Sequence, residues 1–160
     1  MFDSLSKWLF GWLKGGPHFR IGSPESPYML RWYVIPRNPF FNIYIHKFLR
    51  SDDDRAMHDH PWWFLSVMLW GKYAESLYRN GRRTHDIRTA PSIVFRRPTD
   101  RHIVSLLTRG DKILPCWTLV FTGRKVREWG FWCPKGFVRW QDFVDHRDNG
   151  NVGRGCGEMP

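Results

Sequence analysis

The sequence predicts an all-β domain preceded by a short helix, and its composition carries this prediction. The chain of 160 residues contains 14 Gly and 11 Pro, which divide its apolar residues into short runs. Aromatic residues reach 17% of the chain and accompany Val and Ile in these runs. Aromatic and β-branched side chains favour strands, whereas Gly and Pro favour turns. We therefore expect one domain built from many short strands rather than a helical bundle.

The first segment, residues 2–14, has the pattern of an amphipathic helix. Its apolar side chains fall on one helical face, and Gly15-Gly16-Pro17 ends the pattern. We expect this face to pack on the barrel or on a second subunit, with docking on a membrane surface through its two Trp residues as the alternative. Turn-rich residues follow, so residues 1–27 are predicted to form a helix and a linker.

Strand-like runs separated by turn signals fill residues 28–146, which are predicted to form the β domain. Asn80-Gly81 is the strongest hairpin signal, and residues 123–125 are expected to close another hairpin. The Gly-rich residues 147–160 have little to bury and are expected to be flexible. The predicted strands are residues 28–35, 41–48, 62–70, 72–78, 92–96, 98–104, 116–122, 126–133 and 137–143.

The three cysteines, Cys116, Cys133 and Cys156, form an odd set without a CxxC pair. This pattern indicates neither a disulfide framework nor a thiolate zinc site. Cys116 and Cys133 lie at the far ends of a predicted hairpin and could be neighbours, but we expect them to be reduced. No secretory signal is convincing, because Asp3 stands where a basic region is expected. A cytoplasmic location is therefore predicted.

The charge balance favours an anionic ligand. The chain has 25 Lys and Arg against 15 Asp and Glu, which gives a net charge of +10. The basic residues are dispersed along the chain and match no known nucleic-acid motif, so a small anionic substrate is preferred to nucleic acid. No membrane partner is expected, and pairing of two chains is left open.

The stretch from Met57 to Pro61 holds two histidines in one alternating pattern. In an extended segment His58 and His60 share a face and Asp59 takes the other. Two neutral imidazoles a few ångströms apart are the start of a metal site. The apolar run that follows, residues 62–70, is too short to span a membrane and continues as a buried strand. The histidines are thus expected to enter a core.

This arrangement resembles the cupins, small jelly-roll barrels of double-stranded β-helix type. Their two motifs have the forms G-x5-H-x-H-x3,4-E-x6-G and G-x5-P-x-G-x2-H-x3-N. His58 and His60 match the histidine pair, Gly71 matches the closing glycine, and residues 98–102, ending at His102, resemble the second motif shortened by one residue. More narrowly, HDHPWWF, LWGKYAE, RHIV, TLVFTG and REWGFW resemble a group of small cupin-like proteins of bacterial and phage genomes whose activity is unassigned.

The resemblance implies a metal held by three ligands: His58, His60 and His102. The glutamate of the first motif would fall where this chain has Phe64 or Leu65. A three-histidine site is similar to that of the thiol dioxygenases and leaves positions open for water, substrate or dioxygen. Fe(II) is the first choice of metal, and nickel, manganese and zinc are alternatives because imidazole discriminates weakly among them.

Two further residues are candidates for catalysis. Glu75 shares a strand face with Tyr73 and Leu77; if that face is interior, its carboxylate either pairs with Arg127 or a neighbouring arginine, or serves as an acid or base. Arg127, if it points inward, would suit a substrate carboxylate or phosphate.

Two other residues receive structural interpretations. His46 follows Tyr44 on one strand face and is expected to be a hydrogen-bonded residue rather than a ligand. Asp52 belongs to the acidic stretch of residues 51–55, whose consecutive carboxylates indicate a solvated turn rather than a cation site.

The leading functional hypothesis is a metal-dependent oxygenase acting on a small anionic molecule. One alternative is a non-catalytic module that binds a nucleotide, sugar or nucleic acid through Trp residues and basic side chains. The other is a metal-assisted isomerase or hydrolase, which would need Glu75 or a similar group near the metal.

Overall fold

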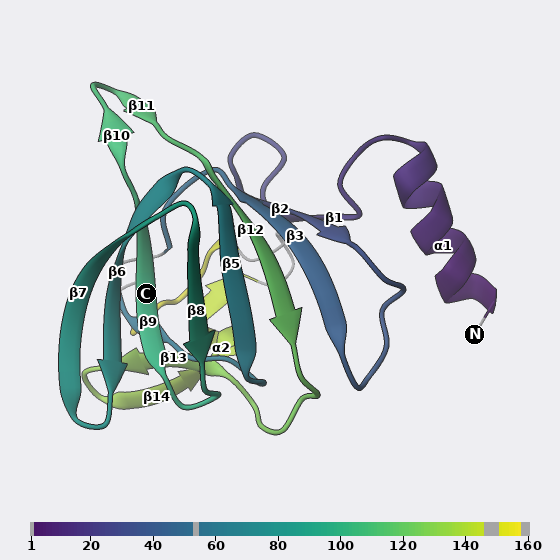
Figure 1. Ribbon diagram of the computed structural model, residues 1–160. Helices are drawn as coiled ribbons and strands as arrows, with labels where there is room; N and C mark the ends of the chain where they lie inside the picture. Colours follow the sequence, from purple (N-terminus) through teal and green to yellow (C-terminus); the bar gives the residue numbers. More distant parts are fainter. Residues whose placement is uncertain (1, 53–54, 146–150, 158–160) are drawn as a thin grey trace.

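Two six-stranded antiparallel sheets form the body of the protein, and helix α1 (Phe2–Leu13) lies beside one of them (Figure 1). The computed structural model describes residues 2–52, 55–145 and 151–157. Every strand pairing in the two sheets is antiparallel. The predicted all-β barrel with an N-terminal helix is confirmed.

The first sheet joins strands that are distant in the sequence. β12 lies at its centre and pairs with β3 on one side and β5 on the other. In spatial order its strands are β1 (Phe19–Gly22), β2 (Pro27–Tyr33), β3 (Asn42–Phe48), β12 (Cys116–Thr122), β5 (Phe64–Trp70) and β8 (Ser92–Arg96).

The second sheet carries a short central strand that matters for function. This strand, β4, contains only two residues and joins β13 to β9. In spatial order the strands are β14 (Gly136–Arg139), β13 (Gly130–Cys133), β4 (Met57–His58), β9 (Arg101–Leu106), β6 (Lys72–Arg79) and β7 (Arg82–Thr89).

The remaining elements are small. β10 (Thr108–Arg109) pairs with β11 (Lys112–Ile113), and β15 (Val144–Asp145) pairs with β16 (Asn151–Val152). A four-residue helix, α2 (Trp140–Phe143), follows β14.

Alternating burial along the central strands sets which side chains face the interior. In β12 every second side chain, from Cys116 to Thr122, is buried, and the side chains between them are partly exposed. β3, β5 and β6 show the same alternation. The inward residues form apolar clusters such as Met68, Tyr73, Val104, Leu106 and Cys116. Period-2 patterning therefore determines the barrel interior, as the sequence predicted.

The turn between β5 and β6 requires a glycine. Gly71 has a φ of 88°, in the left-handed region that disfavours other residues. A Cβ at this position would lie 2.9 Å from the Cβ of Cys116 and 2.9 Å from the carbonyl oxygen of Pro115. Gly71 thus lets the chain pass closely beside β12 as it moves from one sheet to the other.

Helix α1 docks on the first sheet through its indole groups. Trp8 Nε1 donates to the carbonyl oxygen of Tyr33 at 2.7 Å, and Trp12 Nε1 donates to the same oxygen at 3.1 Å. Other apolar residues of the helix, including Leu9 and Leu13, stay exposed. No helix within residues 2–52, 55–145 and 151–157 has the length and apolar character needed to cross a membrane.

The predicted hairpin around residues 123–125 is wrong. β12 belongs to the first sheet and already has a neighbour on each side, whereas β13 belongs to the second sheet and pairs with β4 and β14. The segment between them therefore crosses from one sheet to the other. Residues 124–129 contain no strand, so the second strand of the predicted hairpin starts only at Gly130.

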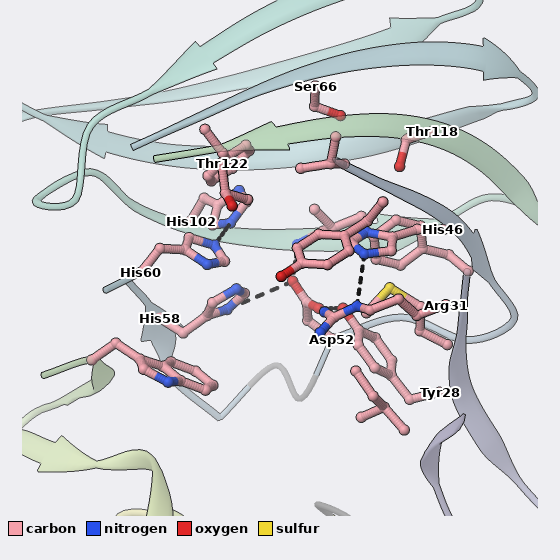
Figure 2. Close-up of a pocket in the computed structure, with 18 of the residues that line it drawn as sticks. Tyr28, Arg31, His46, Asp52, His58, His60, Ser66, His102, Thr118 and Thr122 are labelled. Carbon is pink, nitrogen blue, oxygen red and sulfur yellow. Dashed lines mark hydrogen bonds and ion pairs between the residues drawn. The ribbon is translucent and has the colours of Figure 1, made fainter. Parts of the chain in front are cut away.

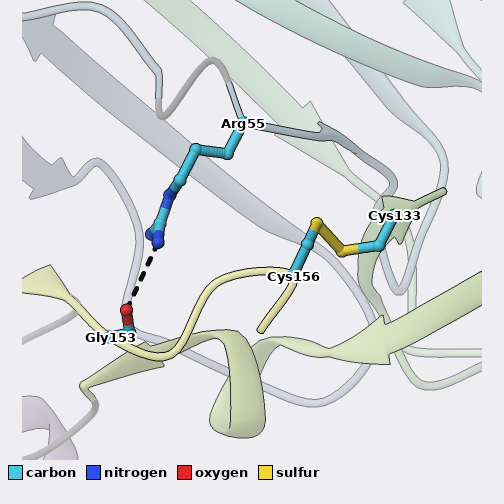
Figure 3. The surroundings of a disulfide bond; sticks show 4 residues. All are labelled: Arg55, Cys133, Gly153 and Cys156. Carbon is cyan, nitrogen blue, oxygen red and sulfur yellow. Dashed lines mark hydrogen bonds between the residues drawn. A yellow bond between two sulfur atoms is a disulfide. The ribbon is translucent and has the colours of Figure 1, made fainter. Parts of the chain in front are cut away.

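The expectation that the cysteines are reduced is also wrong for one pair. Cys133 forms a disulfide with Cys156 (Figure 3). Cys116 is free and buried. The described part of the predicted flexible tail also has contacts, since Arg55 Nη1 donates to the carbonyl oxygen of Gly153 at 3.3 Å. Residues 147–150 and 158–160 lie outside the described residues. Disulfides persist mainly in oxidising compartments, so this bond does not support the predicted cytoplasmic location, which stays a prediction.

Candidate metal centre

Three histidines from two strand segments meet inside the barrel. His58 ends β4 and is the direct cross-strand partner of His102 in β9, while His60 follows two residues after His58. The ring centroids are 4.7 Å apart for His58 and His102, 5.0 Å for His58 and His60, and 5.1 Å for His60 and His102. One ring nitrogen of each lies within 4.8 Å of the others. The structure thus brings together the three predicted ligands.

The donor set of this cluster fits a divalent metal ion. His60 Nε2 and His102 Nε2 are 2.9 Å apart. Two nitrogen ligands at right angles, each about 2.1 Å from a metal, would be separated by about 3 Å. Imidazole nitrogens are ligands for iron, nickel, zinc and related metals. The cluster could therefore hold such an ion with little rearrangement of these two rings.

Burial keeps His58 and His60 in the neutral form that binds metals. Burial lowers the pKa of His58 to about 4, against a smaller opposing effect of the Asp52 carboxylate. Burial, reinforced by the neighbouring histidines, holds the pKa of His60 well below its ordinary value. Both rings are therefore neutral at pH 7, as metal ligands must be.

Glu75 lies behind His102 and fixes its orientation. Its Oε1 accepts a hydrogen bond from His102 Nδ1 at 2.8 Å and another from Arg96 Nε at 3.0 Å. Burial would raise the pKa of Glu75, but hydrogen bonds from His102 and Arg96 hold that pKa at about 2. Since an ionised carboxylate only accepts, the His102 proton sits on Nδ1, and Nε2 presents its lone pair to the cluster.

This position changes the role expected for Glu75. The carboxylate is interior and paired with arginines, which agrees with the predicted salt bridge. Its partners are Arg96 and Arg88 rather than Arg127. It does not belong to the cavity wall beside the histidines. Glu75 is therefore a positioning residue for His102, and an acid or base role in contact with substrate has no support from its location.

Arg127 also lies outside the cavity wall. Its Nη1 donates to Asp59 Oδ2 at 2.6 Å and to the carbonyl oxygen of Pro98 at 2.8 Å. Asp59 has no exposed surface and also accepts from the Gly130 backbone N–H at 3.1 Å and Trp132 Nε1 at 2.9 Å. A buried carboxylate needs such partners. Arg127 therefore neutralises Asp59, and its predicted role as receptor for a substrate anion is corrected.

A cavity of about 490 Å³ extends from the three histidines between the two sheets (Figure 2). Aromatic rings such as Phe64, Trp129 and Phe131 form much of its apolar wall near the histidines. The cavity also has polar lining residues that come mainly from the first sheet and the loop before β4: Tyr28, Arg31, His46, Asp52, Ser66, Thr118 and Thr122.

Asp52 is a site residue that sequence reasoning missed. Its carboxylate accepts hydrogen bonds from the Tyr28 hydroxyl and, at 2.6 Å, from the Val104 backbone N–H. The same carboxylate lies 3.7 Å from His58 Nδ1. The prediction of a solvated turn is wrong at this residue, because the Asp52 backbone also pairs with β9 through Val104. A run of consecutive aspartates gives no signal of which one turns inward.

Arg31 and His46 were missed as cavity residues. Arg31 Nε donates to His46 Nε2 at 2.9 Å, and the Arg31 guanidinium stacks over the Tyr44 ring. His46 is thus hydrogen-bonded and lies outside the three-histidine cluster, as predicted, and the structure places it in the interior rather than on the surface. One signal was available in the sequence, since Arg31 shares the alternating face of Met29 in a strand.

Comparisons with known proteins support the fold. No family model matches the chain, and no curated protein matches it. The crystal structure of Fe(II) HppE is similar with a TM-score of 0.50 and 11% identity, covering 65% of this chain and 54% of that one. Vicilin from Solanum lycopersicum (tomato) is similar with a TM-score of 0.51 and 6% identity, covering 70% and 33% respectively.

A third similar structure is an RmlC-like cupin family protein with a double-stranded β-helix fold from Methanocaldococcus jannaschii. Its TM-score is 0.43 with 9% identity, and the match covers 61% of this chain and 81% of that one. The paired antiparallel sheets and the inward histidines define a double-stranded β-helix barrel with a candidate metal site. The chain thus shares the fold of HppE and vicilin, and it spans about half the length of HppE.

Proposed function

We propose that the protein is a metal-dependent oxygenase that acts on a small anionic molecule, with Fe(II) held by His58, His60 and His102. The observation that carries this proposal is the position of the histidine cluster in the wall of an interior cavity. A bound ion there would meet a substrate rather than only solvent. A similar fold in an Fe(II) protein supports the choice of metal over nickel, manganese or zinc.

The proposed chemistry divides between the ion and the chain. Bound Fe(II) supplies open coordination positions for substrate and dioxygen. Glu75 holds His102 with its Nε2 lone pair toward the cluster. The rings of Phe64 and Trp129 pack around His60 and limit the access of water. This arrangement keeps His58 and His60 neutral and surrounds the cluster with apolar rings.

Tyr28 and Asp52 supply a proton-holding pair beside His58. Burial, followed by the charge of Asp52, raises the pKa of Tyr28 well above its ordinary value. The phenol therefore stays protonated and donates to the Asp52 carboxylate. A substrate bound beside His58 would meet this pair, which favours a second candidate function: metal-assisted isomerisation or hydrolysis with the pair as acid and base.

The test of the proposed function uses protein purified without a histidine tag and loaded anaerobically with Fe(II). We expect about one metal ion per chain by elemental analysis, and oxygen consumption with at least one member of a library of small acids and thiols. Turnover of a library member without oxygen would favour the isomerase or hydrolase. Absence of bound metal under every loading condition would refute both functions.

A further inference from the structure

We infer that Arg31, held by His46 and joined by the Thr118 hydroxyl, forms the subsite that receives the oxyanion group of the substrate. The inference rests on the proposed function only in calling the bound molecule a substrate. The anion subsite itself follows from the residues that line the cavity. The oxyanion is a carboxylate, phosphate or phosphonate group, since each offers coplanar oxygens to a guanidinium.

The three residues form one row across the first sheet. Arg31 in β2 is the direct cross-strand partner of His46 in β3, and His46 is the direct partner of Thr118 in β12. Neighbouring strands place such partners about 5 Å apart on the same face. All three line the cavity that holds the histidine cluster (Figure 2). The row is therefore built by strand register and does not depend on a loop.

Arg31 carries a charge that the protein does not neutralise. Among the described residues no carboxylate lies within ion-pair distance of its guanidinium, and its one hydrogen bond goes to the neutral His46 ring. By contrast, the buried Arg96 pairs with Glu75, and the part-buried Arg127 outside the cavity pairs with Asp59. A guanidinium in a largely enclosed, low-dielectric site is costly without a counter-ion. A bound anion would supply the negative charge that balances it.

His46 orients the guanidinium and leaves its other edge available. Burial and the charge of Arg31 hold the pKa of His46 well below its ordinary value, so the ring is neutral. Because Arg31 Nε can only donate, His46 Nε2 must accept, and the ring proton sits on Nδ1. Tyr44 stacks against His46 and also lies under the guanidinium. With Nε engaged, the two Nη groups remain as donors for a ligand.

The Thr118 hydroxyl is an independent sign of a missing ligand. Its side chain is 1% exposed, and the hydroxyl has no hydrogen-bond partner among the described residues. A buried hydroxyl without a partner loses the hydrogen bonds it would make to water, so such groups are rare in native proteins. Thr122 is likewise unpartnered, but it lies toward His60 and His102 and is not part of the subsite (Figure 2).

The size of the cavity limits the ligand. A volume of about 490 Å³ is in the range of pockets for small molecules. The ligand would place its oxyanion on Arg31 and its reacting part near the three histidines. A small acid with one oxyanion group and an apolar or lightly substituted body meets these requirements.

The test measures binding of acetate, inorganic phosphate and methylphosphonate by calorimetry, to metal-free and metal-loaded protein. Wild type should bind at least one of the three, and the best of them identifies the oxyanion class. Arg31→Gln should weaken that binding by about tenfold to a hundredfold, because hydrogen bonds to charged groups contribute about 1.5 to 3 kcal/mol. Arg31→Lys keeps the charge but lacks the paired N–H donors of the guanidinium, so it should bind with intermediate affinity.

The matched control is Arg20→Gln, which makes the same charge change at an exposed position of the neighbouring strand β1. It should bind the anion as wild type does. Equal affinity in Arg31→Gln and wild type, or binding of none of the three anions by wild type, would overturn the subsite. Anion binding that depends on Arg31 in protein that never takes up metal would keep the subsite and refute the proposed function.

Discussion

The two ends of the cavity differ in how their charges are balanced. At the histidine end, carboxylates stand behind the rings: Glu75 accepts from His102, and Asp52 lies beside His58. At the other end, the one hydrogen bond of Arg31 within the described part of the chain goes to the neutral His46. Carboxylates behind neutral ligands stabilise an added cation, whereas an unpaired guanidinium stabilises an added anion. One cavity thus offers a site that favours a cation and a site that favours an anion.

The largest expected effect comes from removing a histidine at the metal end. His58→Ala should lower Fe(II) affinity by about a thousandfold or more, because two imidazoles cannot replace three in holding the ion. Elemental analysis after dialysis measures the effect. His85→Ala, at an exposed position of β7, is the control and should retain the metal. Full occupancy in His58→Ala would show that the metal lies elsewhere.

Mild acid should destabilise the metal-free protein strongly. Unfolded histidines take up protons near pH 6.5, whereas folded His58 resists protonation until about pH 4. The folded state is therefore penalised relative to the unfolded state as the pH falls from about 6.5 to about 4, by about 3 kcal/mol for His58 alone. His46 and His60, whose pKa values are also lowered, add to the loss in the same direction.

Urea unfolding of metal-free protein at a series of pH values measures this dependence. The free energy of unfolding should be constant from pH 8 to 7 and should decrease steadily below pH 6.5. A flat profile between pH 7 and 4.5 would contradict the burial of neutral histidines at both ends of the cavity.

A smaller effect is expected for the carboxylate behind His102. Glu75→Gln should weaken metal binding by about tenfold to a hundredfold, as is typical for partners of metal-ligating histidines. Competition with a chelator of known affinity gives the ratio. Asp86→Asn, which removes an exposed carboxylate that also pairs with Arg88, is the control and should leave metal affinity unchanged. An unchanged affinity in Glu75→Gln would remove the proposed positioning role.

The smallest effect is expected from removing the Thr118 hydroxyl at the arginine end, which should change anion binding but not folding. Thr118→Val removes a hydroxyl that has no partner among the described residues and keeps the side-chain volume. The free energy of unfolding should therefore stay within about 1 kcal/mol of wild type or rise. Affinity for the preferred oxyanion should nevertheless fall by a few-fold. Marked destabilisation without loss of anion binding would assign the hydroxyl to the fold instead of the subsite.

The three ligands at the metal end could be predicted from the sequence, whereas the pairing of residues at the arginine end could not. Alternation along one strand places His58 and His60 on one face, and the cupin resemblance adds His102. The pairing of Arg31 with His46 depends instead on the register between two strands, which alternation within each strand does not determine.

Other differences between prediction and structure have the same origin in long-range pairing. The segment after β12 crosses between sheets although its turn residues suit a hairpin. Cys133 pairs with Cys156 because the C-terminal segment returns to the second sheet, and local spacing carries no information about such a return. The inward turn of Asp52 likewise depends on its pairing with β9.

The most direct test of the metal centre is an anomalous difference map, measured at the iron absorption edge from crystals of untagged, Fe(II)-loaded protein. We predict a single strong peak within bonding distance of ring nitrogens of His58, His60 and His102. The absence of a peak between these three residues, or a peak at another position, would contradict the account.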